Sequence, residues 1–169
     1  LGDVMSIFGI PYRGGYLSPD RGQAREGEVF SPCGAAMMID RALFLELGGF
    51  DEDFFCYGED VDLGYRLQLA DEPTLLVPGA VIRHVGSAST GGRKSEFAVF
   101  HGTRNRFWVL FKDTPALLLP LVVPLHMVAL TAIYLRRENR PHAALIWKAV
   151  KAAFAGAPMI FRSRRSVQA

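Results

Sequence analysis

Hydrophobic residues recur at helical spacing in three stretches before residue 113. The stretch RALFLEL (residues 41–47) follows Asp40, a residue suited to capping a helix, and Gly48-Gly49 follows as a stop. The stretch EDVDLGYRLQLA (59–70) predicts a second helix, with Leu63 and Leu67 facing inward and acidic residues in the first turn. Residues 95–112 predict a third, amphipathic helix.

Short apolar runs predict three strands: GAAMMID (34–40), PTLLVP (73–78) and AVIRH (80–84). The first 32 residues are rich in Gly, Pro and Ser and predict a long loop, and GSASTGGRKS (86–95) predicts a flexible one. The chain is long enough for one domain with a core, and half of its residues are hydrophobic. These patterns predict an α/β domain of short mixed strands and helices over residues 1–112.

Residues 113–169 have a different pattern and predict a helical tail. The 22 residues from Thr114 to Leu135 carry no formal charge, which is enough to span a bilayer, although Pro120 and Pro124 would kink the helix. Residues 136–169 hold eight Lys or Arg and one Glu, interleaved with aromatic residues, as in a basic segment on an anionic membrane surface. A membrane span, and a hairpin packed on the domain or on a partner, both remain open.

Charge is distributed unevenly along the chain. Residues 1–72 carry 14 Asp or Glu against 5 Lys or Arg, a balance of −9, whereas residues 73–169 carry 3 against 14, a balance of +11. This asymmetry indicates an acidic site in the first part and an anionic partner for the second. Two cysteines without metal-type spacing predict reduced thiols, and we expect no nucleic-acid partner.

Six acidic residues fall between Asp51 and Asp62, among several aromatic ones. The residues from Asp51 onward do not match an EF-hand calcium loop, because Phe55 occupies the position of an oxygen ligand and Cys56 occupies the position of the turn glycine. Asp60 and Asp62 are two residues apart on a helix and therefore point in different directions. We expect Asp62 only to favour the helix start, while a carboxylate at a helix N-terminus is biased towards the ionised state that a general base needs.

Several motifs in order resemble the inverting family 2 glycosyltransferases of the GT-A fold, in particular a rhamnosyltransferase-like branch. They are PDRGQ (19–23), GAAMMIDR (34–41), LGGFDEDFFCYGEDVDLGYR (47–66), VPGAVIRHVGSAS (77–89) and RNRFWVLFKDTP (104–115). The family's nucleotide-binding half has no counterpart in residues 1–46, so the chain resembles the C-terminal, acceptor-side half of such an enzyme.

The resemblance implies a role for each matching residue. Asp60 corresponds to the catalytic base and Glu59 to a residue that positions the acceptor, while Asp51 and Glu52 shape a turn. Gly34 and Ala35 lie where the family passes close to the donor sugar, and Gly49 is also expected to contact substrate. His84 corresponds to a ligand of Mn²⁺ or Mg²⁺ whose co-ligands lie in the other half. Arg66 is expected to pair with the nearby acids, and Arg104 and Asn105 match a recurrent pair with no role that we can assign.

The resemblance predicts transfer of a sugar from a nucleotide-diphosphate donor to a glycan or lipid-linked acceptor of cell-envelope polysaccharide. It further predicts work at the cytoplasmic face of the membrane, with the tail as a peripheral anchor or a membrane segment near 114–135. The alternative is a non-catalytic, membrane-attached remnant or interaction module of a truncated glycosyltransferase.

Overall fold

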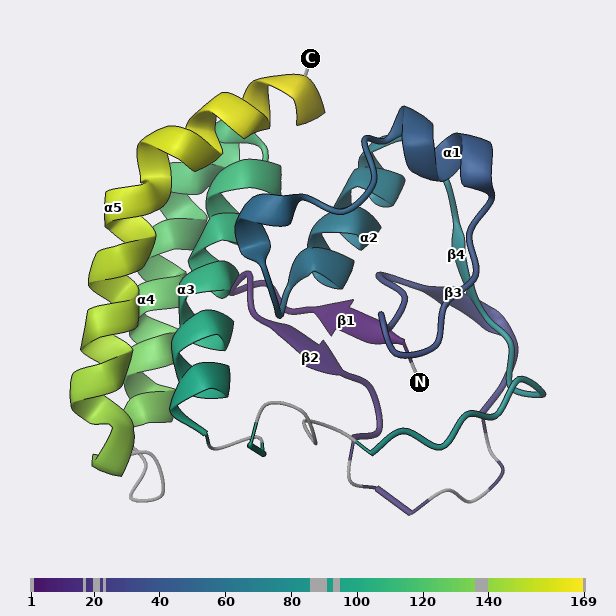
Figure 1. Cartoon of the computed structure of the whole chain (residues 1–169), viewed down its shortest axis with the longest axis horizontal. Helices are drawn as coiled ribbons and strands as arrows, with labels where there is room; N and C mark the ends of the chain where they lie inside the picture. The colour runs from purple at the N-terminus through teal and green to yellow at the C-terminus, as the bar shows by residue number, and fades with distance from the viewer. Residues whose placement is uncertain are drawn as a thin grey trace.

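The computed structural model describes residues 2–16, 18–19, 22, 24–85, 91–92, 95–135 and 140–168, with the side chains of Arg140 and Ser166 left undescribed. A bundle of long helices lies beside a smaller part that holds short strands and two shorter helices (Figure 1). This mixture agrees with the predicted α/β class. The strands are β1 (Asp3–Met5), β2 (Pro11–Arg13), β3 (Gly27–Val29) and β4 (Thr74–Leu76). The helices are α1 (Arg41–Glu46), α2 (Glu59–Leu69), α3 (Glu96–Asp113), α4 (Leu119–Tyr134) and α5 (Ala143–Val167), with 3-10 turns η1 (Glu52–Phe54), η3 (Ala116–Leu118) and η4 (Arg140–His142).

Two antiparallel pairs of strands make up the sheets. β1 pairs with β2, with Asp3 opposite Arg13, and β3 pairs with β4, with Gly27 opposite Leu76. The prediction of one long loop over residues 1–32 is therefore wrong for these segments. Each strand has only three residues, too few to show an alternating pattern, and the partner of β3 lies far along the chain.

The predicted strands near Gly34 and Ala80 are also wrong. Residues 33–36 form a tight turn, in which Ala36 N donates to Cys33 O at 2.9 Å. The apolar run that follows has no strand partner among the described residues. Residues 80–84 are exposed and belong to neither of the two sheets. Of the predicted strand over 73–78, the central residues form β4.

The three helices predicted before residue 113 are confirmed. Asp40 caps α1 by accepting from Ala42 N and Leu43 N. Gly48 and Gly49 both have positive φ (83° and 69°), which ends the helix as predicted. Ser95 caps α3 by accepting from Ala98 N at 3.2 Å. Residues 86–90, 93 and 94 of the predicted flexible loop lie outside the described residues.

The helices α3, α4 and α5 run side by side in the bundle, and α5 lies along the whole of α3 (Figure 1). The core fills the space between them and η1, around Phe54, Phe107 and Trp108. Trp108 donates from its indole nitrogen to Ala153 O, and a Cβ at Gly156 would lie 2.6 Å from the same ring. The glycine therefore permits the close approach of α5. The predicted division at residue 112 coincides with the end of α3 and stays a prediction.

Two helical stretches, Ala116–Tyr134 and Ala143–Arg165, are long and apolar enough to cross a membrane, with mean hydropathies of 2.2 and 1.4. Pro124 lies inside α4 and Pro158 inside α5, yet both helices continue through their prolines. The argument that these two helices cross a membrane rests on their length and composition alone.

Candidate active site

The acidic turn between Gly49 and α2 is held by one amide side chain. Asn105 of α3 donates from Nδ2 to the carbonyl oxygens of Phe54, Cys56 and Tyr57, at 2.9, 2.8 and 2.6 Å. Arg104 adds a bond to Phe54 O at 3.0 Å. Two non-glycine residues of the turn have positive φ, Phe55 at 62° and Tyr57 at 69°, a conformation that costs free energy and persists only where the surroundings enforce it.

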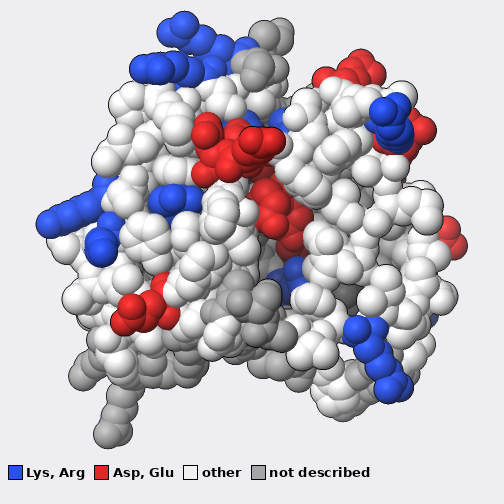
Figure 2. Space-filling view, viewed as in Figure 1, with Lys and Arg blue, Asp and Glu red and all other residues white. Residues whose placement is uncertain are grey.

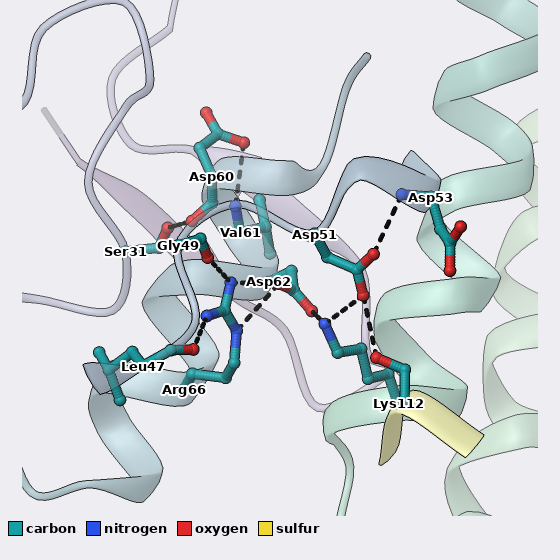
Figure 3. Close-up of polar contacts among 11 residues, drawn as sticks. Ser31, Leu47, Gly49, Asp51, Asp53, Asp60, Val61, Asp62, Arg66 and Lys112 are labelled. Carbon is teal, nitrogen blue, oxygen red and sulfur yellow. Dashed lines mark hydrogen bonds and ion pairs between the residues drawn. The ribbon is translucent and has the colours of Figure 1, made fainter. Parts of the chain in front are cut away.

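A buried charge network fixes both ends of this turn (Figure 3). Lys112 Nζ lies 2.6 Å from Asp51 Oδ2 and 2.6 Å from Asp62 Oδ1. Arg66 forms a two-pronged ion pair with Asp62 Oδ2 and donates to the carbonyl oxygens of Leu47 and Gly49. Arg66 thus pairs with the acids as predicted. The expectation for Asp62 is wrong, because this side chain is fully buried and forms ion pairs with both Arg66 and Lys112.

Burial raises the pKa of Asp51, but the hydrogen bond and charge of Lys112 outweigh burial, and the net result is a lowered pKa. Asp51 also caps η1 by accepting from Asp53 N, and it accepts from Ser163 of α5. The pKa of Asp113 is shifted in the opposite direction, well above the usual range. Burial is the main cause, and the negative charge of Asp62 adds to it. The two cations, Lys112 and Arg66, therefore pair with two carboxylates, those of Asp51 and Asp62.

Asp60 lies at the second position of α2, where main-chain groups orient its carboxylate. Gly34 N donates to Asp60 Oδ2 at 2.9 Å and Val61 N donates to Oδ1 at 2.9 Å. A Cβ at Gly34 would lie 3.3 Å from this side chain. Ser31 is fully buried and donates to Asp60 O at 3.0 Å. The turn at 33–36 therefore orients Asp60 and is not part of a strand.

A pocket of about 250 Å³ opens at Asp60. β1 and β2, the start of α2 and one face of α3 supply its walls, which consist of Asp3, Pro11, Tyr12, Arg13, Tyr57, Gly58, Glu59, Asp60, Val61, Gly102, Asn105, Arg106 and Val109. Figure 2 shows acidic and basic side chains in the hollow between the helical bundle and the rest of the molecule. The pocket thus combines carboxylates and guanidinium groups around a space the size of a small ligand.

Glu59 stands beside Asp60 in the pocket. Burial raises the pKa of Glu59, and the negative charge of Asp60 adds to the effect. Its Oε2 is buried without a hydrogen-bond partner among the described residues. A buried carboxyl oxygen with no partner is costly, so this atom is available to a hydroxyl group of a ligand.

The other predicted site residues lie apart from this pocket. Ala35 is exposed in the turn beside Gly34, and Gly49 contacts the ring of Phe44 and accepts from Arg66. His84 is exposed in the extended segment after β4. In the part of the chain that the structure describes, no group of three or more His, Cys, Asp or Glu side chains is arranged to hold a metal ion. The described residues alone therefore do not fit a divalent cation, and its ligation by His84 stays a prediction.

Three residues that line the pocket had no role in the sequence-based prediction: Arg13, Asn105 and Arg106. Arg13 pairs with Asp3 across the β1–β2 hairpin at 3.1 Å, and Arg106 follows Asn105 on the pocket face of α3. The recurrent Arg104-Asn105 pair was a signal for Asn105. The sequence did not indicate which backbone carbonyl oxygens the Asn105 side chain would contact.

Comparison with known proteins identifies the family of this chain. A family model described as "Glycosyltransferase like family 2" matches residues 12–109, which include the turn that Asn105 holds and all of the pocket's lining residues except Asp3 and Pro11. Two curated relatives are each named N-acetylglucosaminyl-diphospho-decaprenol L-rhamnosyltransferase, from Mycobacterium tuberculosis strains CDC 1551 / Oshkosh and ATCC 25618 / H37Rv. Each is 45% identical over 58 residues, which cover 34% of this chain and 19% of the relative.

The matched segment thus spans about a fifth of the relatives' length, and no solved structure matches the chain. The family match covers more than half of the chain and contains the strongest motif block, residues 47–66. The chain belongs to the glycosyltransferase-like family 2.

Proposed function

We propose that this chain forms the acceptor side of an inverting glycosyltransferase, with Asp60 as the general base. The observation that carries the proposal is the Asp60 carboxylate, which lines the pocket and is fixed by main-chain N–H groups of residues 34 and 61. Each carboxylate oxygen accepts one of these bonds and retains a lone pair for a substrate hydroxyl. A base positioned in this way supplies roughly 10²–10⁴-fold in rate.

The reaction follows from this placement. Asp60 takes the proton of an acceptor hydroxyl as that oxygen forms a bond to the anomeric carbon of the donor sugar. The bond from the anomeric carbon to the nucleotide diphosphate breaks on the opposite face, so the configuration inverts and the diphosphate leaves with the electron pair. Glu59 accepts or donates a hydrogen bond at a second acceptor hydroxyl.

The proposed donor is a nucleotide-diphosphate sugar, and the proposed acceptor is a glycan or a lipid-linked sugar. The names of the two relatives give a lipid-linked acceptor, N-acetylglucosaminyl-diphospho-decaprenol, for those proteins. Gly34, Ala35 and Gly49 are proposed to face substrate. A divalent cation at His84 belongs to the same proposal and requires ligands beyond the described residues. A metal titration of transfer that is identical in wild type and His84→Ala would exclude this cation site.

The test of the base is Asp60→Asn in the full-length protein. Asn keeps the shape and loses the basic oxygen, so transfer should fall about 10²–10⁴-fold while donor binding is unchanged. Asp53→Asn is the matched control, since Asp53 is exposed on the same acidic turn and lies outside the pocket. Unchanged turnover in Asp60→Asn would refute the assignment.

We further propose that the C-terminal helices contact a membrane at its cytoplasmic face. Leu117, Leu121 and Val128 are 90%, 61% and 67% exposed, and Leu121 and Val128 share one face of α4. The double variant Leu121→Glu/Val128→Glu should move the protein from the membrane fraction to the soluble fraction. Leu75→Glu, at an exposed position of β4, is the control and should leave the distribution as in wild type. Retention of the double variant on membranes would contradict this proposal.

A further inference from the structure

The α3 wall of the pocket contains a glycine that the fold does not require. Gly102 lies inside a long helix, where glycine costs about 1 kcal/mol relative to alanine. A Cβ at this position meets no atom within 4 Å, whereas a Cβ at Gly156 would collide with Trp108. Neither packing nor backbone conformation explains Gly102, but the missing side chain leaves room in the pocket that it lines.

One turn further along α3, Arg106 lines the same pocket. It is half-buried and makes no hydrogen bond or ion pair with any residue that the structure describes. Two nearby arginines, by contrast, have partners in the fold. Arg13 pairs with Asp3. Arg104 donates to Phe54 O, and its guanidinium carbon lies 4.0 Å from the centroid of the Trp108 ring. Arg106 is thus a guanidinium group in the pocket that the fold does not use.

We propose that Arg106 binds the phosphoryl group of the acceptor and that Gly102 leaves room for its sugar ring, which makes the acceptor a sugar phosphate or diphosphate. This inference rests on the proposed function, because Asp60 receives the hydroxyl end of the same molecule. The guanidinium group binds phosphoryl oxygens through two parallel N–H···O bonds, and the sugar ring occupies the space beside Gly102. The carboxylates of Glu59 and Asp60 repel a phosphoryl group and accept from hydroxyl groups, so the pocket's two charges fix the orientation of the sugar.

Binding measurements by titration calorimetry, on the full-length protein in mild detergent, test this inference without requiring turnover. The probes are N-acetylglucosamine 1-phosphate, N-acetylglucosamine and thymidine diphosphate. We expect the sugar phosphate to bind about tenfold or more tightly than the free sugar, the range for hydrogen bonds to a charged group. Arg106→Gln should abolish this preference and leave binding of the free sugar unchanged, and Arg106→Lys should retain part of it. Arg162→Gln, at an exposed position of α5, is the control and should bind as wild type does.

Gly102 provides a steric test of the same site. Gly102→Leu should abolish binding of both sugar probes, because its side chain enters the space next to Arg106. Its melting temperature should equal or exceed that of wild type, since the position is open and glycine disfavours helix. Gly102→Ala is the smaller matched change and should weaken binding less.

Equal binding of the two sugar probes by wild type, or an Arg106→Gln variant that keeps the preference, would overturn the inference. Thymidine diphosphate binding that depends on Arg106, with no preference for the sugar phosphate, would assign the residue to the donor's leaving group and overturn the acceptor assignment. Asp60→Asn separates the two proposals, since it should retain sugar phosphate binding. Full transfer by Asp60→Asn together with Arg106-dependent sugar phosphate binding would refute the base and support the phosphate site.

Discussion

Replacement of Lys112 by methionine should be among the most destabilising single changes in the chain. The ammonium group is buried, with its side chain 3% exposed, and it lies 2.6 Å from carboxylate oxygens of both Asp51 and Asp62. Methionine fills a similar volume but leaves Asp62 with one cation instead of two. Removing one partner of a buried ion pair costs about 3–5 kcal/mol, because a carboxylate is left uncompensated away from water. Since Asp51 is closer to solvent than Asp62, we expect a value near the lower end, about 3 kcal/mol.

The free energy of unfolding from denaturant titrations in mild detergent measures this effect, and thermal melts should show a fall of roughly 6–12 °C. Lys148→Met is the control, because Lys148 is exposed on α5 and its loss should change stability by less than about 0.5 kcal/mol. The double variant Lys112→Met/Asp51→Asn should recover part of the loss, since it removes a carboxylate together with its cation. A loss below about 1 kcal/mol for Lys112→Met, with no recovery in the double variant, would refute the buried network as its source.

Three further predictions concern the groups around this network. Asn105→Ala removes the amide that donates to three carbonyl oxygens of the turn, of which Phe54 O keeps its bond from Arg104, so it should cost about 1–3 kcal/mol in denaturant titrations and speed amide exchange in residues 54–58. The pKa of Asp113 is raised in the folded state, so the stability that this carboxyl contributes is lost as pH rises above about 4, the pKa of an unfolded carboxyl group. Asn does not titrate, so Asp113→Asn should be increasingly more stable than wild type as pH rises. Thermal melts that match wild type from pH 4 to 8 would contradict this. Gly64→Ala places a Cβ 2.4 Å from Ser31 and should cost about 1–3 kcal/mol by the same titrations.

Local signals predicted the helices and their ends. Asp40, Gly48 and Gly49 act within a few residues of the helix that they delimit, so sequence was sufficient for α1 and its stop. The apolar run after Gly34 was misread as a strand, because its first residues instead form the turn that reaches Asp60. The hairpin of β1 and β2 was missed because three-residue strands carry no measurable period.

The site was predictable only where a motif was contiguous. Glu59 and Asp60 were found from a motif block, and they line the pocket together. That Asp60 and Asp62 would point apart followed from helical geometry and is confirmed. The role of Asp62 was missed because its partner Lys112 lies on another helix, 50 positions further along the chain. Arg106 could not be placed, since its position depends on how α3 packs against the start of α2.

The main-chain anchoring of Asp60 has a consequence for how this pocket can change. The carboxylate is aimed by peptide N–H groups at positions 34 and 61, and every residue except proline supplies such a group. If Asp60 is the base, as proposed, side-chain exchanges at the rim, such as Tyr12 or Gly102, should alter which acceptor fits while the position of the Asp60 carboxylate stays constant. Position 34 restricts this freedom, because any side chain there crowds the carboxylate. New acceptor specificities should be reachable by redesign of the rim, with residue 34 kept as glycine.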